Sequence, residues 1–250
     1  MRFLLPFLLA ASVAAVTANA ETPIEHSNET RFQLDLKVPD AELAKFVPSG
    51  FTMNVSTTGA AKDCNVRVVF IDRVTINNPD GTPKGKGSNR LVYLAVPVKN
   101  AAGEGSQLII GGLTADDAPG PYANYLLASK HSMTTETSGF NPILQTQHWS
   151  FQAATGEHLE MDITFQRGSA AVRPLGDTKF YSAKNPTFYQ ISRQEQVLDI
   201  MKNVTTNPPD HVKSFKFKAG GGSWSKLFDG TEKVLSWDNI LWLNRTVLLP

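Results

Sequence analysis

The segment QTQHWSFQAATGEHLEMDITFQRG, residues 145–168, decides the fold class. Apolar and polar residues alternate on both sides of a short turn at 153–156, which is typical of a β-hairpin. If these four residues form the turn, Gln152 pairs with Glu157, and His148 points into the apolar interior with Met161. A shift of one residue in this register would place His148 on the opposite face from Met161.

Similar runs, rich in β-branched and aromatic residues, recur along the chain between turns that contain Gly, Pro and Asn. In the earliest of them, Phe32, Leu34 and Leu36 share one face and Gln33 and Asp35 the other, as in a half-buried strand. The runs favour a barrel or a sandwich over an α/β fold. We expect strands at 31–37, 65–76, 90–98, 107–113, 145–152, 158–166, 211–218 and 240–249.

Helical structure is expected at few places. Asp40 can cap a short helix at 41–46. Apolar side chains three or four residues apart predict a helix over 187–202, and residues 122–129 are either a helix or an irregular crossing segment. The Pro- and Gly-containing segment 77–88 is expected to form a long exposed, mobile hairpin loop.

Residues 1–20 predict a secretory signal peptide. Arg2 precedes an apolar run, and the segment ends on Ala18-Asn19-Ala20 before Glu21. We therefore expect a single domain over 21–250 that is secreted, either extracellular or periplasmic if the host is bacterial. No later run is long enough to span a membrane as a helix, so we expect no membrane partner.

The charge balance and the single cysteine narrow the classes further. The net charge of +1 falls to zero once Arg2 is removed, which predicts no nucleic-acid partner. Cys64 has no second cysteine to pair with and is expected to be a buried structural residue. Four Asn-x-Ser/Thr sequons, which would make the chain a glycoprotein in a eukaryotic host, begin at Asn28, Asn54, Asn203 and Asn244.

Several motifs in the middle of the chain resemble, in order and spacing, the acetoacetate decarboxylase-like family. They are LVYLAVPV at 91–98, GPYANYLL at 120–127, GFNP at 139–142 and the hairpin 145–168, with PDAELAKFVPSGF at 39–51 upstream. The resemblance implies a mainly β (α+β) fold, a cone-shaped β-barrel with a few short helices. It also implies an interior ligand cavity and often a homo-oligomer.

The catalytic lysine of the family has no counterpart at the matching position of this sequence. In the enzymes of that family a lysine forms a Schiff base with a β-keto acid, and a neighbouring lysine activates it. The matching stretch here, GFNPIL at 139–144, contains no lysine, and the family's glutamate is missing from 90–98. Standard acetoacetate decarboxylase activity is therefore not expected. Lys130 is a candidate replacement amine and Glu136 a second catalytic candidate, the alternative being solvated loop residues.

Other candidate site residues follow from the same motifs. His148 is a candidate proton donor or acceptor, and Arg90 a candidate carboxylate anchor. Tyr93, Phe140 and Met161 are candidate ligand-binding residues. For Arg90 and His148, an exposed arginine and a hydrogen-bonded core histidine are the structural alternatives.

The sequence contains no recognisable metal-binding or cofactor-binding motif. His131, His148 and His158 lack zinc-site spacing, and the glycines at 220–222 are not followed by a phosphate-binding Lys-Ser/Thr pair. We expect neither a metal nor a cofactor. Three functions remain: a barrel that binds a small organic acid or hydrophobic metabolite or acts on it without an imine, a β-keto acid lyase that uses Lys130, and a lipocalin-like carrier.

Overall fold

The computed structural model describes residues 21–168, 170–200 and 211–250. The predicted signal peptide at 1–20 and the sequon at Asn203 lie outside these residues. Within the described residues, no helix has the length and apolar character needed to cross a membrane.

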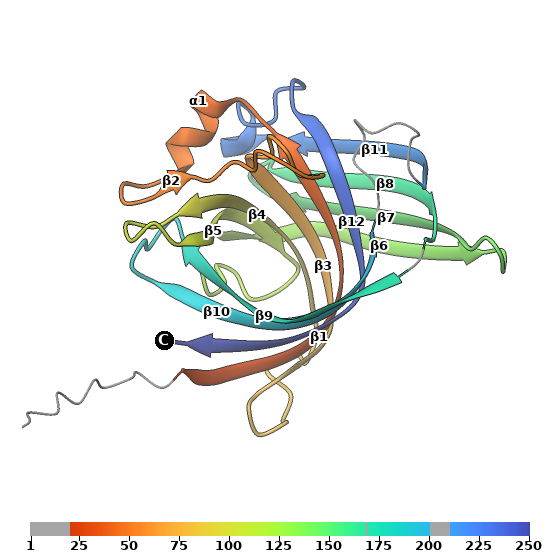
Figure 1. The fold of residues 1–250 in the computed structure, drawn as a ribbon, viewed down its shortest axis with the longest axis horizontal. Helices are drawn as coiled ribbons and strands as arrows, with labels where there is room; N and C mark the ends of the chain where they lie inside the picture. Colours follow the sequence, from red (N-terminus) through yellow and green to blue (C-terminus); the bar gives the residue numbers. More distant parts are fainter. Residues whose placement is uncertain (1–20, 169, 201–210) are drawn as a thin grey trace, which may run out of the picture.

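The described chain is mostly β-strand (Figure 1). The strands are β1 (Thr22–Lys37), β2 (Thr52–Met53), β3 (Val66–Asn77), β4 (Asn89–Lys99), β5 (Gly105–Thr114), β6 (Tyr125–Ser138), β7 (Leu144–Ala153), β8 (His158–Gln166), β9 (Ala170–Ser182), β10 (Tyr189–Ile200), β11 (Val212–Gly220) and β12 (Lys233–Leu249). The mainly β class predicted from the sequence is confirmed.

Helical structure in the described residues is limited to one short α-helix and two 3₁₀ turns. Helix α1 (Asp40–Leu43) continues into the turn Ala44–Phe46, and the second turn is Gly222–Trp224. The predicted helix after residue 40 is confirmed, but Asp40 is its first residue rather than its cap. The Asp40 carboxylate instead accepts hydrogen bonds from Lys37 and Asn65.

Seven of the strands form a closed ring of hydrogen-bonded pairs. The order β5-β9-β10-β12-β1-β3-β4 returns to β5, which pairs with β4 along one edge. The opposite edge of β5 is divided, with Gln107–Ile109 pairing in parallel to β9 and Gly112–Thr114 in parallel to β6. The ring thus has an inner and an outer face, and a second group of strands branches from it at β6.

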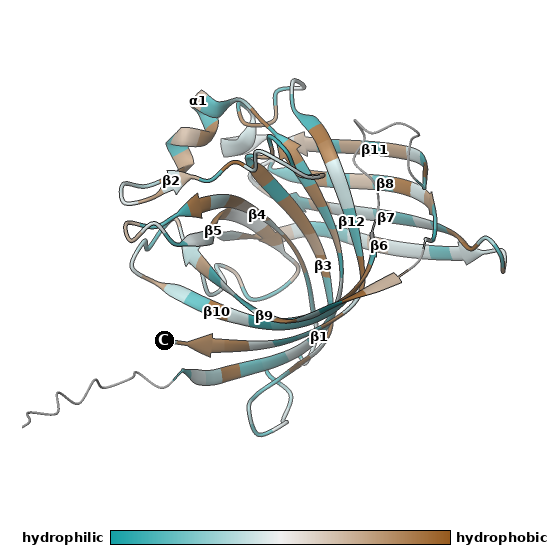
Figure 2. Ribbon diagram, in the orientation of Figure 1, coloured by the Kyte–Doolittle hydropathy of each residue, from teal (hydrophilic) through white to brown (hydrophobic). Residues whose placement is uncertain are grey.

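The second group, β6-β7-β8-β11, packs against the outer face of the ring. Phe32, Leu34 and Leu36 of β1 lie in one buried apolar cluster with side chains of β3, β4, β7 and β8. The ring of Phe70 lies 5.7 Å from that of Trp149, centroid to centroid. Polar residues alternate with these apolar ones along the curved strands (Figure 2). On β1 they include Arg31, Gln33 and Asp35, which line the inside of the ring instead. The main hydrophobic core therefore lies outside the ring, between it and the second group, and a smaller apolar cluster that includes Ile71, Leu91 and Ile109 lies on the inner face.

The β7–β8 hairpin corrects the register predicted from the sequence. Ala153, not Gln152, pairs with Glu157, because the loop has three residues and ends on Gly156 at φ +102°. Gln152 therefore pairs with His158, and Trp149 with Met161. A three-residue loop with a positive-φ glycine at its end is a common hairpin connection. The one-residue shift points Trp149 into the hydrophobic core and His148 towards solvent, as in the alternative register described above.

The predicted helix at 187–202 is wrong over its described part, since β10 pairs with β9 on one side and β12 on the other. Its inner face carries Gln190, Gln194 and Gln196, which line the interior of the ring. A strand with a polar buried face lacks the apolar alternation that marks strands, and its remaining apolar residues happened to fit helical spacing. Tertiary pairing on both edges decided the conformation.

Residues 122–129 are not helical either. The segment starts irregularly, with Ala123 at φ +56°, and enters β6 at Tyr125.

Cys64 is buried as expected, and burial raises the pKa of its thiol to about 12. A thiol held protonated in this way is a structural residue rather than a nucleophile.

Candidate functional site

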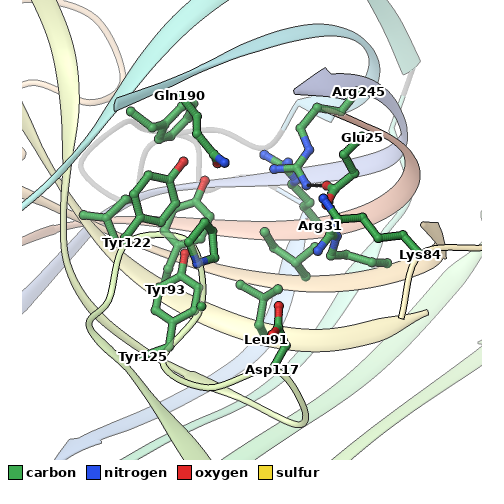
Figure 3. A pocket seen from close by; sticks show the side chains of 16 residues that line it. Glu25, Arg31, Lys84, Leu91, Tyr93, Asp117, Tyr122, Tyr125, Gln190 and Arg245 are labelled. Atoms are coloured by element: carbon green, nitrogen blue, oxygen red, sulfur yellow. Dashed lines mark hydrogen bonds and ion pairs between the residues drawn. The ribbon is translucent and has the colours of Figure 1, made fainter. Parts of the chain in front are cut away.

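A cavity of about 340 Å³ lies inside the ring (Figure 3). Each of the seven ring strands contributes at least one lining residue, from Glu25 on β1 to Arg245 on β12. Two loops complete the wall, one before β6 and one between β3 and β4. The volume is at the small end of the range for ligand pockets.

Three arginines and two glutamates form a buried ionic cluster on one side of the cavity. Nε of Arg31 donates to Glu29 at 2.6 Å, and Nη2 of Arg245 lies 2.9 Å from Glu25 and 3.0 Å from Glu29. Arg73 pairs with both glutamates. The cluster arises because alternate residues of β1 face inward and meet the inward residues of β3 and β12.

The cluster carries more positive than negative charge. Burial alone would raise the pKa of Glu29, but Arg245, Arg31 and Arg73 together hold it far below the usual value, and the pKa of Glu25 is lowered too. Both carboxyls are therefore ionised at neutral pH. Three guanidinium groups against two carboxylates leave one positive charge uncompensated within the buried cluster.

Donors on the arginines remain available. Among the described residues, no hydrogen bond involves Nη1 of Arg31, Arg73 or Arg245. A buried positive charge without a counter-ion is costly, and a carboxylate or another small anion would offset it. The site therefore has both the charge and the free N–H groups to bind an anion.

Tyrosines form the facing wall. Tyr93, Tyr122 and Tyr125 are buried, with the rings of Tyr122 and Tyr125 6.1 Å apart, centroid to centroid (Figure 3). Burial raises the pKa of all three phenols, so they stay neutral and can donate hydrogen bonds. Their hydroxyls have no hydrogen-bond partner within the described part of the chain.

Two glycines make room for this wall. A Cβ on Gly120, which has φ +67°, would lie 2.6 Å from Cδ2 of Tyr125, and a Cβ on Gly112 would lie 2.9 Å from its Cδ1. The segment that follows Gly120 is anchored by the Asn124 amide, which donates to the Ile109 carbonyl at 2.6 Å. The GPYANYLL motif thus positions the aromatic side of the cavity.

One amine lies at the cavity. Lys84 comes from the loop between β3 and β4, which is folded back by backbone hydrogen bonds such as Lys84 N to Ile76 O at 2.8 Å. Lys84 and Glu25 lie on the same side of the cavity (Figure 3), with Nζ 3.2 Å from the Glu25 carboxylate. Nζ also donates to the Ile24 carbonyl at 3.3 Å. The loop is mostly exposed, as predicted from the sequence, but the expectation that the pocket has no amine is wrong, because Lys84 lines it.

A second cavity of about 400 Å³ adjoins the first. Arg31, Tyr93 and Phe180 line both cavities and so lie between them. The second cavity is polar, with Asp35 and Asp238 on its wall. The interior of the ring is therefore two compartments in series.

Of the residues proposed from sequence, Tyr93 lies in the cavity wall. Arg90 does not line either interior cavity, because its Nε donates to Asp72 at 2.9 Å at the surface. Met161 is fully buried in the core beside Trp149, and Phe140 is 94% exposed at the β6–β7 turn. These three positions do not come together.

The three catalytic candidates are also outside the cavities. His148 lies on the outer face of β7, with Nδ1 2.6 Å from Asp162 and its side chain 38% exposed. Lys130 and Glu136 are exposed on β6. No group of three His, Cys, Asp or Glu side chains within the described ranges is arranged to hold a metal ion.

The cluster residues themselves were missed in the sequence. The expected strand began at residue 31, whereas β1 begins at Thr22 and includes Glu25 and Glu29. The available signal was the alternation of charged residues at 25, 29 and 31, which marks one face of a strand. Alternation cannot tell a solvent face from a cavity face.

Several solved structures share this architecture. The enduracididine biosynthesis enzyme MppR complexed with pyruvate is similar at TM-score 0.57 and 11% identity, over 93% of this chain and 91% of that one. An acetoacetate decarboxylase-like enzyme from Sphingomonas wittichii RW1 is similar at 0.53 and 10%, over 96% and 98%. Acetoacetate decarboxylase from Legionella pneumophila is similar at 0.50 and 10%, over 97% and 96%.

The chain has the acetoacetate decarboxylase-like fold. At these identities the likeness shows the fold alone. No family model matches the sequence, and no curated protein is similar to it at a significant level. A lipocalin-like topology is excluded, because lipocalins are up-and-down antiparallel barrels whereas β5 pairs in parallel with β6 and β9.

Within this fold, the turn matched to the family's lysine pair lies at the tip of the β6–β7 hairpin. Residues 139–144 line neither interior cavity. The stretch that does line the cavity after β5, residues 115–125, also contains no lysine. The amine at the cavity is that of Lys84, on a different loop.

Proposed function

We propose that this acetoacetate decarboxylase-like chain binds a small organic carboxylate inside the ring without forming an imine. The observation that carries the proposal is the buried cluster in which three guanidinium groups face two carboxylates. Pyruvate in the complex of the similar MppR structure supports a ligand of this class.

Different lining residues bind the two ends of such a ligand. Free N–H groups of Arg31 and Arg245 hold the carboxylate, and the neutral hydroxyls of the tyrosine wall donate to a keto or hydroxyl oxygen. Ile71, Leu91 and Ile109 pack against the hydrocarbon part. The small volume selects acids of a few carbon atoms.

A Schiff-base lyase that uses Lys84 is the second candidate, since its amine lies at the cavity. Imine formation needs a neutral amine, whereas Nζ of Lys84 is in a salt bridge with Glu25. This arrangement favours binding over imine chemistry.

Binding is tested by calorimetry with pyruvate on the whole chain, comparing Arg31→Gln with Arg90→Gln. Removing Arg31 leaves two guanidinium groups against two carboxylates, so the free variant stays folded while affinity falls at least about tenfold. Arg90→Gln, at the surface pair with Asp72, retains affinity. Equal affinity of both variants would refute the proposed site.

Imine chemistry is tested by borohydride trapping with acetoacetate, followed by peptide mass spectrometry. We expect no adduct. An adduct on Lys84 that disappears in Lys84→Met would establish the lyase instead, and one on Lys130 would establish the amine proposed from sequence.

The proposal includes secretion, on the strength of the leader-like residues 1–20. Cleavage before Glu21 leaves β1 intact, since it starts at Thr22. Expression in the native host followed by N-terminal sequencing tests this. A cytoplasmic chain that begins at Met1 would contradict it.

A further inference from the structure

The two compartments inside the ring have opposite hydrogen-bonding character. The first presents free arginine N–H groups and tyrosine hydroxyls as donors, beside the paired Glu25 and the exposed Asp117. The second presents acceptors: within the described residues, the Asp238 carboxylate has no hydrogen bond or ion pair, and buried Oε1 of Gln107 and Oε1 of Gln194 have no partner. The two buried glutamine oxygens are destabilising unless a ligand supplies donors, and the half-buried Asp238 carboxylate on the same wall is a charged acceptor that such a donor can reach.

The charged side chains of the second compartment do not supply these donors to Asp238. Asp35 accepts from Arg67 at 3.1 Å and from Ser236 at 2.7 Å, so its oxygens are engaged. Of the other two arginines on this wall, Arg31 pairs with Glu29, and Arg173 is exposed and has no hydrogen bond or ion pair to Asp238 among the described residues. The unpaired acceptor group is therefore Asp238.

Register places Asp238 close to the arginine cluster. On β12, Asp238 pairs with Gln33, two residues along β1 from Arg31. Two residues of a strand rise about 7 Å, and alternate residues share a face. Arg31 and Asp238 are thus on neighbouring levels of the same inner surface, and a chain of roughly four to six carbon atoms spans that separation.

We infer that the ligand is bifunctional: its carboxylate binds at Arg31 and its other end carries a hydrogen-bond donor, an amine or a hydroxyl, that binds at Asp238. This inference rests on the proposed carboxylate site and adds the chemistry of the second end. Tyr93 and Phe180, whose rings are in edge-to-face contact, border both compartments, and the ligand runs along them beside Arg31, which also lines both. An ω-amino acid or an ω-hydroxy acid is the substrate class.

Calorimetry with three length-matched probes tests the inference: pentanoate, ω-hydroxypentanoate and ω-aminopentanoate, with the four- and six-carbon homologues of each. At the best length, a donor-bearing probe should bind at least about tenfold more tightly than the plain acid, the gain from a hydrogen bond to a charged group. The stronger of the amine and hydroxyl probes identifies the donor.

Asp238→Asn should abolish most of this gain while leaving the affinity for pentanoate unchanged. Asp162→Asn, the same substitution on the outer face of β8, should change neither. A melting curve of each variant confirms that it is folded.

The outcomes separate the two proposals. If pentanoate binds and the donor-bearing probes bind no better, the carboxylate site stands and the bifunctional ligand is overturned. The same holds if the gain survives in Asp238→Asn. If no acid binds the folded wild-type chain, both proposals fail.

Discussion

The two faces of the ring strands differ in what covers them. On β3, Val68 and Phe70 face outward and pack against the second group of strands, whereas Arg67 and Arg73 face inward and line the cavities. The outer face is apolar and closely packed, and the inner face carries charges around open space. A substitution on the outer face should therefore cost stability, and one on the inner face should mainly change binding.

The largest expected effect is on the outer face. Phe70→Ala should lower the free energy of unfolding by about 3–5 kcal/mol, because Phe70 is fully buried against Trp149 and Phe151 and leaves a cavity. Phe180→Ala, on the inner face and only half-buried, should cost markedly less. Urea unfolding measures both. Equal losses would break the distinction between the faces.

Glu29 is the expected exception on the inner face. Glu29→Gln leaves three buried guanidinium groups with one carboxylate and should cost about 3 kcal/mol, the low end for a broken buried pair because the cavity lets water reach the arginines. Since the arginines lower the pKa of Glu29, its contribution exists above the unfolded value of 4.5 and is lost as the pH falls.

The control for Glu29 is Glu42→Gln, which removes the surface pair with Lys45 and should cost less than about 1 kcal/mol. The difference between the two variants should shrink on acidification below pH about 4.5. A constant difference down to strongly acidic pH would contradict the assignment of charge to Glu29.

Gly120→Ala tests whether a change on the inner face alters binding, because it should displace the tyrosine wall of the cavity. A positive φ alone costs about 1 kcal/mol, and the new Cβ also displaces Tyr125. Gly81→Ala has a similar φ, +87°, with nothing within 4 Å, so it isolates the backbone cost. Carboxylate affinity should fall in Gly120→Ala only, as calorimetry would show.

The smallest effect is a pH-dependent one at Asp238. Burial, with a further contribution from Asp35, raises its pKa to about 6, against the opposing effect of Arg173 and Arg67. A raised carboxyl pKa means that stability falls as the pH rises from about 4 to about 6. Asp238→Asn should therefore be more stable than wild type above pH 6, and not at pH 4.

Asp40→Asn is the contrasting variant. Hydrogen bonds from Lys37 and Asn65 lower the pKa of Asp40, so this substitution should slightly reduce stability above the unfolded pKa. Thermal unfolding from pH 4 to pH 8 measures both variants. The same sign for the two would show that Asp238 is not held in an unfavourable environment.

Part of the fold could be predicted from local pattern. Phe32, Leu34 and Leu36 marked a strand and its buried face, and the short helix after residue 40 and most strands followed from similar signals. The strand β10 could not, because its inner glutamines removed the apolar alternation. Of the cavity wall, only Tyr93 was named as a candidate, while the GPYANYLL segment was noted for its resemblance to a family and not as part of a site.

The sequence by itself determined that a strand such as β1 has one apolar and one polar face, since side chains alternate with period two whatever surrounds them. Only the tertiary structure decided what covers each face. Closing the ring through β4, β5 and β9 moved the polar face of β1 from solvent to an interior cavity. That closure depends on pairing between distant residues, and it turned Glu25, Glu29 and Arg31 from apparent surface charges into a buried site.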